Sequence, residues 1–397
     1  MTPFDEQFVR LCLEIDKHFE GYIDAYIGPA DLKTAVSATP SRPPKELLAE
    51  CQTLQTAIPT ENPTRHAWLQ AILRAIHYSI RLIQQETIPY LDEVAQIYDI
   101  HPQPMAESVF AQAHQELDTL LPGKGTLAER INNRRKQYHL PQEKVLPLLE
   151  LARDEARQRT LNFIELPGDN GVDITLTSNQ PWAAYNWYKG NGRSHIEFNT
   201  DVPISALGLI NTFAHEGYPG HHTEAVLKEQ KFVKEKGWGE MMVALLHSPS
   251  AVIAEGIATT AAEIIFPNGT AYEWTIDVLL PAAGIKTEET AETMQHIAQA
   301  SEKLRYVAGN AAIYHHTGQF SKEQTIEYIQ NYGLATRERA AKTFSFITHP
   351  LFRSYIFTYT QGYDLITAVS QNGSKQAVFS RLLTEQILPS QLANNTC

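Results

Sequence analysis

Apolar residues recur every three or four positions through most of the chain, which is the spacing of an amphipathic helix. Residues 5–19 carry such a stripe, and Asn62 and Pro63 begin another with a cap and a first-turn proline. The same spacing predicts further helices over residues 45–57, 91–98, 105–121, 127–138, 143–163, 288–316 and 350–369. The hydrophobic pattern therefore predicts a mainly α fold.

The pattern changes after Pro167 and Gly168. Residues 172–177 alternate between apolar and polar positions, as a half-buried strand does. Two more strand-like segments, 185–189 and 194–199, flank a Gly-Asn-Gly sequence that suits a hairpin turn. We expect a small antiparallel β-sheet here, directly before an apolar run that indicates a buried helix over residues 204–214.

The stretch that follows this run concentrates groups that bind metals. Residues 215–224 read His215-Glu216-Gly217-Tyr218-Pro219-Gly220-His221-His222-Thr223-Glu224. The three imidazoles and the carboxylate of Glu216 lie within about two helical turns. In the zinc-hydrolase motif His-Glu-x-x-His, two histidines four apart share one helix face and bind zinc, and the glutamate is the general base. Here the fourth position after His215 is Pro219, which cannot be a ligand.

A regular helix would not bring a later histidine back to His215, because six residues turn through about 600° and rise about 9 Å. Pro219 lacks the N–H that an uninterrupted helix needs, and Gly217 and Gly220 tolerate unusual backbone angles. A bulge that absorbs two residues returns His221 to the face of His215, whereas three are needed for His222. We therefore predict His215 and His221 as ligands. The alternative is a helix–loop junction with surface histidines.

A catalytic zinc site needs a third protein ligand from another helix. Ser248 and Pro249 suit the start of a helix built largely of small residues, and Glu255 is the only acid between Glu240 and Glu263. A carboxylate on such an apolar helix is costly to bury unless it is paired or bound to a metal. Glu255 is therefore the predicted third ligand. The alternative is a glutamate that faces solvent.

These motifs resemble a known family. The sequence His-Glu-x-x-Pro-Gly-His-His at residues 215–222, followed by Glu-Gly at 255–256, is similar to that of the domain of unknown function 885, which is grouped with the gluzincin metallopeptidases. Residues 192–200 resemble its strand before the motif helix, residues 21–29 its N-terminal signature, and residues 359–362 its C-terminal Tyr-x-x-Gly. The resemblance implies a large helical metallopeptidase-like fold, with the small sheet beside the active-site helix.

One departure from the family concerns a late histidine. The family often has an aspartate a few residues before it, and Ala312 stands at the corresponding place before His316.

The chemistry that we expect is metal-assisted amide hydrolysis, with one Zn²⁺ per chain. His215, His221 and Glu255 would hold the ion, and Glu216 would take a proton from water and pass it to the leaving amine. His222 would either stabilise the ligands without binding the ion itself, or replace His221 as a ligand. Manganese and cobalt suit the same donor set.

Further candidates come from the family resemblance and from position in the chain. Tyr359, on the Tyr-x-x-Gly, and then His316 are candidate donors to the oxyanion, although either could be structural. Arg353 would bind a substrate carboxylate or form an ordinary ion pair. If the sheet edge pairs with an extended peptide, as the resemblance implies, the substrate-binding residues are His195, Glu197 and Asn199. The alternative is an ordinary structural hairpin.

The composition limits the classes of molecule that the chain is expected to bind. The net charge of −12 argues against nucleic acid, whose binding rests on lysine and arginine contacts to phosphate. The scattered Cys12, Cys51 and Cys397 form no disulfide framework. No stretch has the eighteen or so continuous apolar residues of a membrane span, and residues 1–16 lack the apolar core of a signal peptide. We therefore expect a cytoplasmic protein with a peptide substrate.

The expected organisation is an N-terminal helical region, residues 1–166, and a metal-binding catalytic region, residues 167–397, forming one body with a cleft. Three functions remain open: a zinc peptidase for short peptides, a metal-dependent amidase or other hydrolase acting on non-peptide substrates, and a non-catalytic metal-binding protein.

Overall fold

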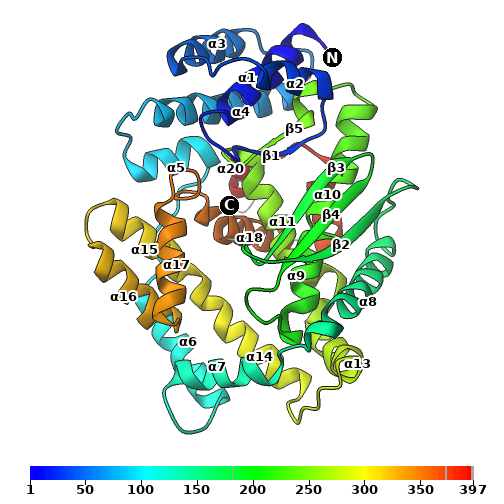
Figure 1. Ribbon diagram of the computed structural model, residues 1–397, viewed down its shortest axis with the longest axis vertical. Coiled ribbons are helices and arrows are strands. Elements are labelled where there is room, and N and C mark those ends of the chain that lie inside the picture. The colour runs from blue at the N-terminus through cyan, green and yellow to red at the C-terminus, as the bar shows by residue number, and fades with distance from the viewer. Residues whose placement is uncertain (181, 372, 395–397) are drawn as a thin grey trace.

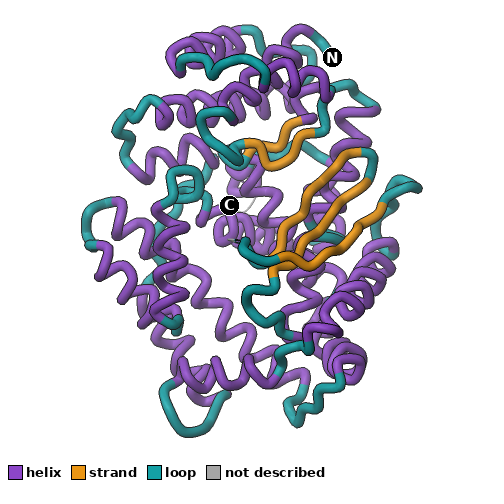
Figure 2. The backbone as a smooth tube through the Cα atoms, viewed as in Figure 1, coloured by secondary structure: helices purple, strands orange, loops and turns teal. Residues whose placement is uncertain are grey.

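The computed structural model describes residues 1–180, 182–371 and 373–394 of the chain. These residues form helices α1 to α20 and strands β1 to β5, as Figures 1 and 2 show. The predicted mainly α fold is thereby confirmed. Cys12 and Cys51 are buried free thiols, and Cys397 lies outside the described residues.

The N-terminal helices form one layer of the molecule (blue to cyan in Figure 1). Their bounds are α1 Pro3–Asp16, α2 Ala30–Ser37, α3 Pro44–Thr56, α4 Pro63–Ile83 and α5 Tyr90–Tyr98. α1 begins at a capping box, in which Thr2 and Asp5 each bond to the other's backbone. Its apolar face, with Phe8 and Leu11, packs into a core that also takes Val243, Leu245 and Leu351 from much later in the chain.

The opposite end and both sides of the molecule are also helical. These parts contain α6 Glu107–Leu120, α7 Leu127–Gln137, α8 Gln142–Leu161, α14 Ala291–Glu302, α15 Val307–His316, α16 Lys322–Gly333 and α17 Arg337–Thr348. The helical segment predicted over residues 288–316, for which an interruption at Gly309 and Asn310 was the alternative, is divided into α14 and α15 by a 3₁₀ turn at Lys303–Tyr306. α16 begins at a capping box formed by Ser321 and Gln324.

Two small sheets lie between these layers (orange in Figure 2). The larger contains β2 Gly171–Thr177, β4 Arg193–Asn199 and β3 Ala184–Gly190, in that order. The predicted antiparallel hairpin is present as β3 and β4, whereas β2 pairs parallel to β4. In the smaller sheet, β1 Ile23–Tyr26 pairs antiparallel with β5 Val243–Leu245. The larger sheet is therefore mixed, and β4 is its middle strand.

The central helices are α9 Leu209–Glu216, α10 His221–Lys228, α11 Pro249–Ile265 and α18 Ile356–Ser370, with shorter helices packed around them: α12 Thr270–Trp274, α13 Leu280–Ala283, α19 Lys375–Thr384 and α20 Pro389–Asn394. α11 and α18 approach each other closely at Gly256 and Gly362. A Cβ atom on Gly256 would lie 2.6 Å from the carbonyl oxygen of Gly362. Only glycine allows this backbone contact, which fixes how the two helices align.

Within the described residues, no single helix has both the length and the apolar composition needed to cross a membrane. The segments Pro249–Ile265 and Pro267–Ala283, which meet at an angle of 47°, are together long and apolar enough for a membrane span, by length and composition alone. Most of α11, the first part of this pair, is buried against other parts of the chain.

Candidate metal centre

The stretch from His215 to His222 spans the end of one helix and the start of the next. α9 ends at Glu216 and α10 begins at His221, so the expected bulge is a complete break of the helix. The loop between them contains a cis peptide bond before Pro219. Both histidines therefore stand at helix ends that meet.

Gly220 allows the loop to fold back over α9. Its amide donates a hydrogen bond to the carbonyl of Ala214, at 3.0 Å. A Cβ atom on residue 220 would lie 2.0 Å from the carbonyl oxygen of His215, so no other residue fits without moving the backbone. The ring centroids of His215 and His221 are consequently only 4.8 Å apart.

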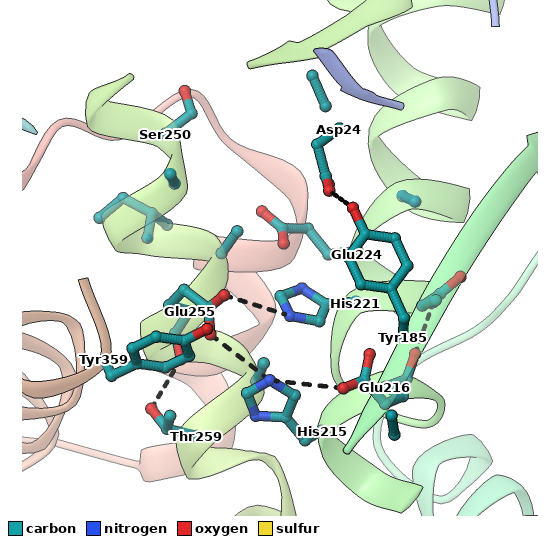
Figure 3. A pocket seen from close by; sticks show the side chains of 18 of the residues that line it. Asp24, Tyr185, His215, Glu216, His221, Glu224, Ser250, Glu255, Thr259 and Tyr359 are labelled. Carbon is teal, nitrogen blue, oxygen red and sulfur yellow. Dashed lines mark hydrogen bonds and ion pairs between the residues drawn. The ribbon is translucent and has the colours of Figure 1, made fainter. Parts of the chain in front are cut away.

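Glu255 completes a cluster with these two histidines. One potential ligand atom from each of His215, His221 and Glu255 lies within 4.8 Å of the other two. The Nε2 atom of His215 is 3.5 Å from Oε2 of Glu255, and that of His221 is 3.9 Å from Oε1 (Figure 3). Ligand atoms about 2.1 Å from a tetrahedral zinc ion are about 3.4 Å from each other. The structure thus brings together the predicted ligands at distances that suit such an ion.

The burial of Glu255 supports the fit to a cation. Its Oε1 atom accepts a hydrogen bond from the hydroxyl of Tyr355 at 2.7 Å, while its Oε2 atom is buried and has no hydrogen-bond partner among the described residues. Burial raises the pKa of Glu255 to about 8 and lowers the pKa of His221 to about 4. A bound cation would stabilise the carboxylate and the neutral imidazoles together, which is the protonation that metal binding requires.

Glu216 is a second buried acid at this centre. Its Oε1 atom is 3.9 Å from Nε2 of His215, and its carbonyl accepts a hydrogen bond from the amide of Asn186, at 2.6 Å. Burial, together with the nearby charges of Glu255 and Asp24, raises the pKa of Glu216. A carboxylate with a raised pKa beside a metal site is suited to taking up a proton and releasing it.

The cluster opens into a cavity of about 1800 Å³. Among the residues that line it are Asp24 of β1, Tyr185 of β3, Glu224 of α10, and Tyr355 and Tyr359 at α18. The hydroxyl of Tyr185 donates a hydrogen bond to Asp24, above His221 and Glu216 in Figure 3. The cavity wall therefore combines segments from both ends of the chain.

Sequence reasoning gave no role to Asp24, Tyr185, Glu224 or Tyr355. Asp24 lies in the segment 21–29 that resembles a family signature, and this was the one available signal. Tyr22 is fully buried, while Tyr26 is partly exposed and bonds to the carbonyl of Pro29.

Tyr359 lies in the cavity wall next to Glu255, as Figure 3 shows. Burial and the charges of Glu255 and Glu216 raise its pKa, so its hydroxyl stays protonated and able to donate. His222 points elsewhere: its Nδ1 atom lies 2.8 Å from the hydroxyl of Ser194, and its ring packs against Tyr218. The structure thus places Tyr359 at the centre and His222 in the protein interior.

The expected position of the substrate on β4 is wrong. β4 lies between β2 and β3, so its backbone is already paired on both sides. None of His195, Glu197 and Asn199 lines the cavity as far as the chain is described. Their side chains bond to neighbouring strands and loops, at Thr175, Trp187, Gln180 and Trp182. The strand at the cavity is β3, the end strand of the sheet.

His316 and Arg353 also lie outside the cavity lining that the described residues form. His316 stacks on Tyr90, with ring centroids 4.3 Å apart, and its Nε2 atom is 2.7 Å from the carbonyl of Ile347. Arg353 forms an ion pair with the buried Glu93. The structure therefore gives no support to an oxyanion donor at His316. For Arg353 it supports the ordinary ion pair, not a site for a substrate carboxylate.

Comparisons with known proteins add information on the fold. No family model matches the chain, so the likeness to the domain of unknown function 885 remains a resemblance, and no curated protein matches either. A "putative lipoprotein" from Colwellia psychrerythraea is similar in structure, with a TM-score of 0.59 and 14% identity, over 98% of this chain and 74% of that one.

Two further solved structures are similar. A "putative lipoprotein of unknown function" from Shewanella oneidensis has a TM-score of 0.52 and 12% identity, over 96% of this chain and 80% of the other. Metallocarboxypeptidase 1 of Trypanosoma cruzi has a TM-score of 0.41 and 11% identity, over 99% and 90%. At these identities the two lipoprotein structures show that the chain shares their fold, and they show nothing of its activity.

Proposed function

We propose that this chain is a metal-dependent hydrolase, and specifically a zinc peptidase that cleaves short peptides. The observation that carries the proposal is the cluster of the half-buried His215 and His221 with the buried Glu255, and with Glu216 beside it in a large cavity. Two imidazoles and one carboxylate are the donor set of several catalytic zinc sites, which leave one position open for water. A structural site would be expected to have a fourth protein ligand.

Each residue of the cluster has a role in this proposal. Zinc, when bound, would supply a Lewis acid and lower the pKa of a bound water. Glu216 accepts the proton of the attacking water and later delivers it to the departing amine. The hydroxyl of Tyr359 donates a hydrogen bond to the oxygen that gains charge in the transition state.

The peptide would lie along β3. β3 is an end strand of its sheet, with β4 as its one strand partner in the part of the chain that the structure describes, and residues 182–188 line the cavity. Pairing with the backbone of an end strand holds an extended peptide irrespective of its side chains. This arrangement moves the expected substrate contact from β4 to its neighbour.

The test begins with metal content, measured by mass spectrometry on protein purified without chelator or nickel. We expect about one zinc per chain and hydrolysis of members of a short-peptide library. Glu216→Gln should retain the metal and lose about 10²- to 10⁴-fold in turnover. The matched control is Glu263→Gln, which changes another carboxylate of the cavity, about two turns beyond Glu255 on α11. We expect this variant to stay active.

Each alternative has its own outcome. Protein that takes up no metal, even on reconstitution, would refute the proposal. Metal without peptide cleavage would favour an amidase acting on other substrates or a non-catalytic metal-binding protein. Full turnover by Glu216→Gln would remove Glu216 as the base.

A further inference from the structure

Two tyrosines near α18 face two glutamates of α11 at the same spacing. The hydroxyl of Tyr355 donates to Oε1 of Glu255 at 2.7 Å, and that of Tyr363 to Oε1 of Glu263 at 3.2 Å. Tyr363 follows Tyr355 by eight positions, and Glu263 follows Glu255 by the same number. α18 and α11 therefore run in the same direction. Eight residues correspond to about 12 Å along a helix, and the second pair is therefore remote from the metal cluster.

The two pairs differ in their surroundings. Tyr355 and Glu255 are both buried, whereas the pair of Tyr363 and Glu263 is exposed. The ring of Tyr355 also packs edge-on against Tyr98, Phe352 and Tyr359. These three contacts hold the ring in one orientation, so its hydroxyl is directed at Glu255 before any ion binds.

This hydrogen bond distinguishes the two oxygens of Glu255. Oε1 accepts the hydrogen bond from Tyr355. Oε2 is buried, has no hydrogen-bond partner within the described parts of the chain, and faces Nε2 of His215 at 3.5 Å. Without the hydroxyl, the carboxyl group would be free to rotate, and two buried oxygens would lack hydrogen bonds. A carboxylate that is fixed in advance loses less conformational freedom when it binds an ion.

We propose that Tyr355 is a positioning residue, which orients Glu255 so that Oε2 is presented to the metal. The inference rests on the proposed function, because it requires that Glu255 bind a metal. Tyr355 acts through Glu255 and touches neither the ion nor the reacting atoms. Tyr359, one turn along α18, is the residue that we assign to the substrate.

The test measures zinc affinity by competition with a chromophoric chelator, on the full chain. Tyr355→Phe keeps the ring and removes only the hydroxyl, and we expect it to weaken zinc binding by about 10- to 100-fold. Tyr363→Phe removes the equivalent hydroxyl from the remote pair and is the matched control, with wild-type affinity expected. Circular dichroism checks that both variants fold.

A second comparison shows whether Tyr355 acts through Glu255. In a Glu255→Ala background, adding Tyr355→Phe should change zinc affinity no further, because the group that it positions is already gone. A further loss there would overturn the inference, and this comparison does not depend on the folding of the single Tyr355→Phe variant.

The outcomes separate this inference from the function on which it rests. If wild-type protein takes up no zinc, both fail. If wild type binds zinc and Tyr355→Phe binds it equally well, the inference alone is overturned. A lower turnover at unchanged affinity would likewise overturn it, since it would indicate a direct contact with the substrate.

Discussion

His221 and His222 are adjacent in sequence, yet their surroundings differ completely. His221 faces His215 and Glu255, whereas His222 is fully buried between Ser194 and Tyr218. Successive residues of a helix point about 100° apart, so the first turn of α10 sends one ring into the cavity and the other into the core. Burial lowers the pKa of His222 to about 3, which keeps its ring neutral.

These surroundings predict that the two alanine substitutions affect different properties, zinc affinity for His221 and stability for His222. His221→Ala should lose zinc, with a drop in affinity greater than the 10- to 100-fold or so that is typical of changes outside the ligand set. His222→Ala should keep zinc but lose about 1–3 kcal/mol of unfolding free energy, because it leaves a cavity and an unpaired Ser194. Zinc content after dialysis and urea unfolding measure the two effects. Loss of zinc from His222→Ala alone would reverse the ligand assignment.

At the residue scale, the sequence predicts the side chains whose chemistry is unusual for their position. His215, Glu216 and His221 stand at a proline-glycine interruption, and Glu255 is an isolated acid on a helix of small residues. Asp24, Tyr185 and Tyr355 have no such local signal. They reach the centre because β1, β3 and α18 pack around it, and those contacts join residues a hundred or more positions apart. Tertiary packing of this kind is not encoded in local spacing.

At the scale of elements, the contact between α11 and α18 determines the alignment of Tyr355 with Glu255. Gly256→Ala would place a methyl group 2.6 Å from the carbonyl oxygen of Gly362 and 2.7 Å from Ile366, so the helices would have to separate. We expect a loss of about 1–3 kcal/mol in unfolding free energy, together with weaker zinc binding. Gly168→Ala, whose added methyl meets no atom within 4 Å, is the control. Wild-type stability in Gly256→Ala would show that this helix contact is not tight.

The helices and strands were largely predictable, but their pairing was not. The alternating pattern located β2, and the Gly-Asn-Gly turn located β3 and β4, since both signals are local. The position of β2 within the sheet has no such local signal. β2 pairs in parallel with β4, on the side away from β3, and this makes β4 the middle strand. That arrangement depends on a connection across the hairpin. The substrate prediction for His195 to Asn199 failed for this reason. No signal within those seven residues of β4 distinguishes a middle strand from an edge strand.

At the scale of the whole molecule, the cavity determines which substrates can reach the centre. Its volume of about 1800 Å³ exceeds the roughly 300–1,000 Å³ of sites for small ligands, and its walls come from both the N-terminal and the C-terminal parts of the chain. An extended peptide adds about 3.4 Å per residue, so several residues fit, whereas a folded protein would not. Turnover should therefore be highest for short peptides in a fluorogenic series of increasing length, with casein uncleaved. Cleavage of casein as fast as of the shortest peptides would contradict this limit.

The pairing of β1 with β5 also has a consequence for how the chain folds. Ile23 pairs with Leu245, so more than two hundred residues separate the two strands. The N-terminal helices are synthesised well before Val243, Leu245 and Leu351, which complete their core. This layer cannot reach its final packing until most of the chain has left the ribosome, and contacts so distant in sequence form slowly. In that interval the apolar faces of α1 and α4 are covered only in part, by each other and by α3, and we expect the remainder to be the surface that a chaperone would bind.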